Sequence, residues 1–261
     1  MTSAPPALKR PLSDMPCDPG YIQLSYELEA SLDNSDREDT LEKWRVTAHL
    51  GEDGFRLEAI PPCDQCTARW NRTEDEGGFV DEDEDCPHRL HVGVLELVKV
   101  RWGGSQNPFW AMEEESQNLY EIAETVFNDE HDGYTEEFEE LTEAWGEDLL
   151  VLDKAELDEG WRGFGLGPMI AADALRRLAP GCRAVMVHPA PIDATGMSKD
   201  EWARARDRLR ELWATVGFVP YGETPYMIFA TCWADPENKQ YALRKASREL
   251  STQWRAARQR G

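Results

Sequence analysis

Several stretches of the chain alternate apolar and polar residues or run apolar over a short length. These patterns are typical of β-strands, which place successive side chains on opposite faces. They predict strands over 21–32, 44–50, 91–102 and 149–157. Gly51-Glu52-Asp53-Gly54 separates 44–50 from a similar stretch at 55–60, so we also expect a hairpin there and a small antiparallel meander at the start of the fold.

Other stretches repeat their apolar residues at helical spacing. The repeat predicts two acidic helices within 110–147, a helix after Pro168 and another after Ser198. Proline is favoured at the first helical position, and Ser198 with Glu201 forms a capping box. Short apolar stretches at 184–188, 218–221 and 226–232 predict the remaining strands. Strands and helices together indicate a mixed α/β fold.

The chain is expected to form a single domain over 19–235, between two dissimilar ends. Residues 1–18 are rich in proline, lack the apolar segment of a secretory signal, and are expected to be disordered. Residues 236–261 predict a basic helix, which either folds onto the acidic body or, as we favour, stays solvated. Inside the domain, 61–90 is an acidic, cysteine-containing insertion, long for a connection without its own elements.

Composition limits the classes of partner. The 261 residues carry a formal charge of −23, which argues against nucleic acid. No apolar run reaches the length of a membrane span, so no membrane partner and a cytoplasmic location with reduced thiols are expected. Between Arg101 and Lys154 there is no lysine or arginine, and acidic residues are frequent. This predicts a solvated acidic face or, alternatively, an electrostatic funnel for a cationic amine.

Four residues of the insertion have side chains that bind zinc: Cys63, Cys66, Cys86 and His88. A Cys-x-x-Cys pair is half of many structural zinc sites, and three thiolates with one imidazole complete a tetrahedral set. The second half, Cys-x-His, is tighter than usual. The alternative is that these are free cysteines in a solvated loop.

The stretch after the predicted strand at 149–157 suggests phosphate binding. Arg162-Gly163-Phe164-Gly165-Leu166-Gly167 is a glycine loop that opens a helix at Pro168. Glycines let an anion approach the main-chain N–H groups, and a helix start adds unpaired donors and partial positive charge. The loop lacks the Gly-Lys-Ser/Thr of a P-loop and the spacing of a Rossmann fingerprint. A glycine turn of purely structural use remains an alternative.

The pattern Arg-x-x-Gly-x-Gly, placed between a strand and a helix, resembles the acyl-CoA signature of the GNAT superfamily of N-acetyltransferases. A second similarity is the helix that ends in Gly217-Phe218. The resemblance implies a mostly antiparallel sheet flanked by helices. It also implies acetyl-CoA or another acyl-CoA as co-substrate, held by Leu157, where the strand splays, and by Arg162, Gly163, Phe164, Gly165, Leu166 and Gly167.

Acyl transfer to an amine needs a proton acceptor and, for the leaving thiolate, a proton donor. Glu156 and Asp158 flank the splayed position, and His188 ends the next predicted strand. The family commonly has a tyrosine four residues before the glycine of Gly-Phe, where this chain has Trp213. Tyr221 or Tyr226 is then the candidate donor, with Tyr226 preferred, and the alternative is that the thiolate leaves unassisted.

The sequence thus supports two functions. The first is transfer of an acetyl or other acyl group from acyl-CoA to a small amine or to an amine of a protein. The second, motivated by Trp213, is a GNAT-shaped acyl-CoA-binding or regulatory protein with little or no turnover. Neither the acceptor nor the oligomeric state follows from the residues, and a homodimer is one assembly that they allow.

Overall fold

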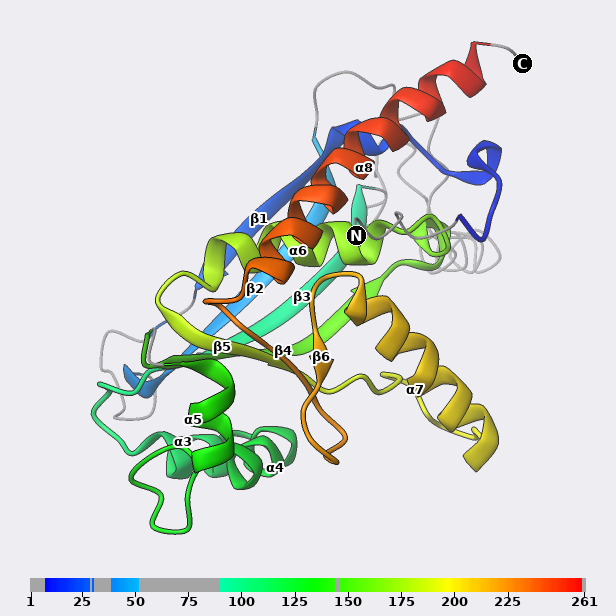
Figure 1. Cartoon of the computed structure of the whole chain (residues 1–261). Helices are drawn as coiled ribbons and strands as arrows, with labels where there is room; N and C mark the ends of the chain where they lie inside the picture. The colour runs from blue at the N-terminus through cyan, green and yellow to red at the C-terminus, as the bar shows by residue number, and fades with distance from the viewer. Residues whose placement is uncertain (1–7, 29, 31–38, 52–89, 144–145, 260–261) are drawn as a thin grey trace, which may run out of the picture.

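The computed structural model describes residues 8–28, 30, 39–51, 90–143 and 146–259. Within them, seven strands form one sheet in the order β1-β2-β3-β4-β5-β7-β6 (Figure 1). All neighbouring strands are antiparallel except β4 and β5, which are parallel. The predicted α/β fold, with a mostly antiparallel sheet, flanking helices and a strand–glycine loop–helix unit, is confirmed.

The strands lie close to the stretches predicted for them. Their bounds are β1 Ile22–Leu28, β2 Leu41–Leu50, β3 His91–Val100, β4 Asp148–Leu157, β5 Cys182–Val187, β6 Val219–Pro220 and β7 Met227–Ala230. The α-helices are α3 Pro108–Glu115, α4 Gln117–Val126, α5 Glu136–Thr142, α6 Leu166–Leu178, α7 Lys199–Ala214 and α8 Ala234–Arg258.

The strand β4 lies at the centre of the sheet and is buried on both faces along its first half. Leu150 and Leu152 face a core formed with α6 and α8, whereas Leu149 and Val151 face a core formed with α3 to α5. All four side chains are at most 2% exposed. The Leu-rich run of the sequence is therefore the run of a strand covered by helices on both sides.

Both edges of β2 are paired, which corrects the predicted hairpin. Residues 44–50 pair antiparallel with β1 on one side and β3 on the other. A strand has two hydrogen-bonding edges, so no edge of this stretch is left for 55–60. Residues 55–60 themselves lie outside the described part of the chain. Local turn chemistry suggested the nearest partner, but the sheet pairs β2 with strands farther away in sequence.

The C-terminal helix α8 packs across α6 and is not the solvated helix that we favour from the sequence (Figure 1). Leu243, Ala246 and Leu250 are buried against the core, while the basic residues of α8 lie on its other faces. Alanines of α6 let the two helices approach closely. The prediction relied on the charge of this segment and overlooked the apolar residues that recur in it at helical spacing.

Part of the N-terminal stretch that we expected to be disordered also packs on the fold. Met15 is fully buried, and its carbonyl accepts a hydrogen bond from the Trp254 indole at 3.4 Å. Asp18 is buried and accepts hydrogen bonds from Ser251 (2.6 Å) and from the Arg255 side chain. Proline-rich composition suggested disorder, but α8 supplies the apolar and polar partners for these residues.

Candidate functional site

The parallel pair β4–β5 separates midway along β4. Main-chain pairing between them ends at Leu152 and Val187, although β4 continues to Leu157 and stays paired with β3. The separation coincides with a β-bulge, since Glu96 pairs with Lys154 and the next residue, Leu97, pairs with Leu152. Asp153 is thus the extra residue on β4, and such a residue bends the strand and increases its twist.

The glycine loop follows this free part of β4 and leads into α6. Gly163 and Gly165 have φ of +89° and +74°, the left-handed region that non-glycine residues rarely adopt. Gly165 is the N-cap of α6, and no side chain caps the helix. In the described chain, the N–H groups of Gly165, Leu166 and Gly167 donate no hydrogen bond. The loop therefore presents free donors at the positive end of the helix.

A cleft of about 480 Å³ opens between the free part of β4, the end of β5 and helix α7. Apolar side chains of β4 and α7 form its walls. Its lining consists of Lys9, residues 152–157, Arg162, Val187, His188, residues 190–193, Ala205, Arg208, Leu209, Leu212 and Trp213. The cleft thus brings together β4, Arg162 at the start of the glycine loop, and helix α7, which lies far from both in the sequence.

The charge of this cleft differs from that of the chain. Four basic residues line it (Lys9, Lys154, Arg162 and Arg208), against three acidic ones (Asp153, Glu156 and Asp193). Its lining is therefore slightly positive, whereas the whole chain carries −23. A local excess of positive charge favours an anionic ligand even where the distant field is negative.

Arg162 is held at the loop entrance. Its Nε donates to the carbonyl of Leu157 at 2.6 Å, and its Nη2 lies 3.7 Å from the carboxylate of Glu156. Glu156 lines the cleft but also pairs with Lys154 at 3.1 Å. Two cations thus share the Glu156 carboxylate.

Asp158 does not line the cleft. Its carboxylate lies 2.8 Å from Nδ1 of His91, the first residue of β3, and its N–H donates to the carbonyl of Val92. The two acidic candidates that flank Leu157 therefore differ in position: Glu156 faces the cleft, and Asp158 belongs to the β3–β4 end of the sheet.

His188 lines the cleft directly after β5. Burial lowers the pKa of its imidazole; nearby Glu121 opposes this shift and Arg210 adds to it. The ring is therefore neutral at neutral pH. Its edge faces the ring of Tyr226, with the centroids 5.2 Å apart. The Tyr226 hydroxyl donates to Glu121 at 3.4 Å, and burial, then this carboxylate, raise the pKa of Tyr226 to about 12.

Trp213 lies on the α7 wall of the cleft and is 5% exposed. Its ring packs edge-on against Phe218, at a centroid distance of 6.0 Å. The residue that departs from the family pattern therefore closes the apolar end of the cleft. An indole N–H does not supply a proton at neutral pH, so Trp213 contributes shape.

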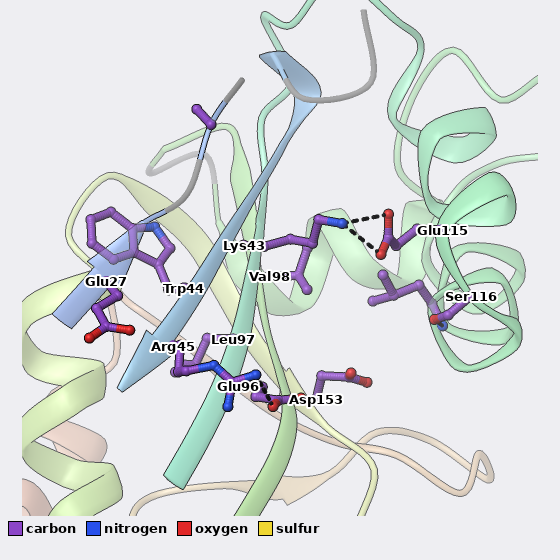
Figure 2. Close-up of a pocket in the computed structure, with 12 residues that line it drawn as sticks. Glu27, Lys43, Trp44, Arg45, Glu96, Leu97, Val98, Glu115, Ser116 and Asp153 are labelled. Atoms are coloured by element: carbon purple, nitrogen blue, oxygen red, sulfur yellow. Dashed lines mark hydrogen bonds and ion pairs between the residues drawn. The ribbon is translucent and has the colours of Figure 1, made fainter. Parts of the chain in front are cut away.

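A second cavity of about 670 Å³ lies over β2 and β3, next to the start of α4 (Figure 2). We call it the acidic groove, because Glu27, Glu96, Glu115 and Asp153 line it against two basic residues. Both bases are paired: Lys43 with Glu115 and Arg45 with Glu96, each at 3.0 Å. In the described chain, Glu27 and Asp153 have no ion pair, and Asp153 accepts a hydrogen bond from Asn118 at 2.6 Å.

Asp153 is the residue shared by the cleft and the acidic groove. We did not single it out from the sequence. The signal was present, because Asp153 is the charged residue that directly follows the apolar run 149–152 in the predicted strand. Lys9 was missed for another reason, because the segment that carries it was expected to be disordered.

The zinc hypothesis concerns Cys63, Cys66, Cys86 and His88, all of which lie outside the described residues. Among the residues that are described, no group of three or more His, Cys, Asp or Glu side chains is arranged to hold a metal ion. Cys182 is buried in the core, and burial raises the pKa of its thiol to about 12. Across the described chain, no helix is both long and apolar enough to cross a membrane.

Comparison with known proteins gives few matches. No family model and no curated protein matches the chain. Among solved structures, the chain is similar to AtaT complexed with acetyl-methionyl-tRNAfMet, with 12% identity and a TM-score of 0.30 over 80% of this chain and 95% of that one. The fold assignment rests on the strand order and the glycine loop described above.

This comparison corrects one expectation. We excluded nucleic acid as a partner because the net charge is −23. The similar solved structure is a complex with a tRNA, so the exclusion is withdrawn. The physical reason is that a partner meets a local surface. Net charge sums over the whole chain, whereas the cleft lining has a slight excess of basic residues and α8 carries six Lys or Arg against three Asp or Glu.

Proposed function

We propose that the chain binds an acyl-CoA in the cleft and transfers the acyl group to an amine. The observation that carries the proposal is that two unsatisfied backbone surfaces are linked by residues that line one cleft, Leu157 and Arg162. These surfaces are the free edge of β4 after Leu152 and the uncapped start of α6. Buried or half-buried backbone groups normally find partners, so a ligand with both phosphates and amides is the natural complement.

The cleft and the glycine loop beside it suit such a ligand part by part. Phosphates match the N–H groups of Gly165, Leu166 and Gly167 with Arg162 beside them. An extended chain with amide groups matches the free edge of β4, in the manner of an added strand. The apolar residues of α7, ending at Trp213, match the thioester end.

The reaction is an aminolysis. The cationic amine first gives one proton to a base. The lone pair of the neutral amine then attacks the thioester carbonyl, a C–N bond forms, and the C–S bond breaks. A second proton of the amine nitrogen passes through water to the leaving thiolate. The products are an amide and free coenzyme A.

His188 is the base that the environment supports best. It lines the cleft, and burial keeps it neutral and ready to accept a proton near pH 7. Glu156 is occupied by two cations, and Asp158 is paired with His91 outside the cleft. Tyr226 packs against His188 and orients its ring, while its own raised pKa keeps the hydroxyl protonated.

The acceptor enters through the acidic groove in this proposal. Glu27 and Asp153 offer uncompensated negative charge to a cationic amine, and Trp44 adds an aromatic wall. Asp153 also borders the cleft, so an amine held there lies next to the thioester end. The frequent acidic residues of α3 and α4 extend the same field outward.

Two measurements test the proposal. Calorimetry with acetyl-CoA is expected to show binding that Arg162→Glu weakens strongly. The same charge change at Arg258, near the end of α8, is expected to leave binding intact. Release of free thiol is then followed with a panel of acceptors: a diamine, a lysine-containing peptide and an aminoacylated RNA. No heat of binding for the unmodified protein would refute the proposal.

An acyl-CoA-binding protein with little turnover is the second candidate. It is favoured by Trp213, which lies in the cleft where the family resemblance implies a tyrosine proton donor. The thiol-release assay separates the two candidates. Binding without release across the whole panel supports this second function.

A further inference from the structure

We infer that the N-terminal segment completes the phosphate site, with the Lys9 ammonium as a direct phosphate ligand. This inference rests on the proposed function, because it names a further residue of the same cleft. Lys9 belongs to none of the motifs in the sequence, and its segment looked disordered from composition alone.

The first observation is that Lys9 is fixed on the glycine loop by its main chain. Its N–H donates to the carbonyl of Gly163 at 2.8 Å. This bond uses an oxygen of the loop and leaves the N–H groups that follow free. The side chain of Lys9 lines the cleft, and the residue is exposed. Lys9 and Arg162, the residue that opens the loop, therefore lie at the same cleft.

The second observation is that Arg10 fastens the segment to the loop. Its Nη1 donates to the carbonyl of Glu159 at 3.3 Å, and its guanidinium lies over the ring of Phe164, 5.1 Å from the centroid. Its methylene groups lie against Gly163, where an added Cβ would be 3.0 Å from Cδ. Arg10 is thus used in packing, and Lys9 remains for the ligand.

The third observation concerns ion pairs. Arg162 and Lys154 both pair with Glu156, but Lys9 has no ion pair within the described chain. An ammonium with three donors and no carboxylate within ion-pair distance among the described residues is suited to a phosphate oxygen. In a chain of net charge −23, such an unpaired lysine at a cleft mouth provides selective attraction for an anion.

The segment is held in place from its other end. Asp18 is bound by Ser251 and Arg255 of α8, and Met15 is buried beneath the same helix. The position of Lys9 therefore follows from the packing of α8 as well as from the loop. Pre-ordering of this kind lowers the entropy that a ligand must remove on binding.

The experiment compares two thioesters by calorimetry: acetyl-CoA and acetyl-pantetheine, which lacks all phosphates. We expect Lys9→Ala to weaken acetyl-CoA binding by about three- to tenfold, as for a partly exposed ion pair, and to leave acetyl-pantetheine binding unchanged. Lys9→Arg is expected to retain most of the affinity. Lys245→Ala, which removes a lysine paired with Glu249 on α8, is the charge-matched control.

Two outcomes overturn the inference, and they differ. If the unmodified protein binds acetyl-CoA and Lys9→Ala binds equally well, Lys9 is no phosphate ligand and the proposed function stands. An equal loss for both thioesters in Lys9→Ala also refutes phosphate contact, since the change then acts on the shape of the cleft. If the unmodified protein binds neither thioester, the proposed function and this inference fail together.

Discussion

Substitution of Gly165 by alanine tests the glycine loop most directly. Gly165 caps α6 with φ of +74° and ψ of 11°. An alanine in this left-handed conformation costs roughly 1–2 kcal/mol. If the loop relaxes to escape that strain, a ligand must restore the original conformation and its affinity falls by the same free energy. We therefore expect acetyl-CoA binding to weaken by roughly five- to thirtyfold.

Gly181→Ala is the matched control. Gly181 has a similar φ of +87°, lies between α6 and β5, and a Cβ there would meet nothing closer than the Lys99 Nζ at 4.0 Å. The same strain then lowers stability alone, by about 2–8 °C in melting temperature for a chain of this size. Calorimetry and thermal denaturation of both variants are the assays. Equal acetyl-CoA affinity in Gly165→Ala and Gly181→Ala would contradict the reasoning on the loop.

Three further predictions concern the base, the acceptor and the N-terminal anchor. His188→Gln should lower kcat about a hundredfold with little change in acetyl-CoA affinity. Because burial lowers the pKa of His188, kcat of the unmodified protein should persist below pH 6.5 and fall only in more acidic buffer. A kcat that declines already near pH 7.5 would contradict this assignment. Glu27→Gln should raise KM for a diamine about two- to fivefold while KM for acetyl-CoA stays constant, because exposed charges contribute little; an unchanged diamine KM in steady-state kinetics would argue against the acidic groove as the entrance. Asp18→Asn should lower the free energy of unfolding by about 1–3 kcal/mol in denaturant titrations at pH 7. Burial alone would raise the pKa of Asp18, but its hydrogen bonds from Ser251, Arg255 and Gly20 outweigh burial and lower it, so the stabilisation is present above the usual carboxyl pKa and is lost as the pH falls through the lowered value. The two proteins should therefore converge in stability in acid, and a constant difference down to pH 2 would refute the ion-pair explanation.

The binary pattern was sufficient for most elements because each of them satisfies its local rule. The run 149–152 is buried on both faces, and Ser198 with Glu201 forms the capping box that their spacing predicts. The glycine loop has the left-handed residues for which glycine is needed. These features depend on a few neighbouring residues, so they follow from the order of the amino acids.

The sequence was less informative about which strands pair and which segments pack together. The hairpin between 44–50 and 55–60 was predicted from a favourable turn sequence. In the sheet, however, β1 and β3 occupy the two hydrogen-bonding edges of β2. Composition made residues 8–18 look disordered and α8 look solvated, although each buries apolar residues against the other or against α6. The contacts between the N-terminal segment and α8 join side chains that are more than 200 positions apart.

The amino-acid order by itself determined the mixed α/β elements, the glycine loop and the phosphate-binding chemistry proposed for it, because strand alternation, helix capping and glycine conformations act within a few residues. Only the tertiary structure decided that β4 leaves β5 at Asp153, that Lys9 comes to lie on the loop, and that Glu156 faces the cleft while Asp158 pairs with His91. These arrangements result from pairing and packing between distant segments, whose free energy no local pattern records.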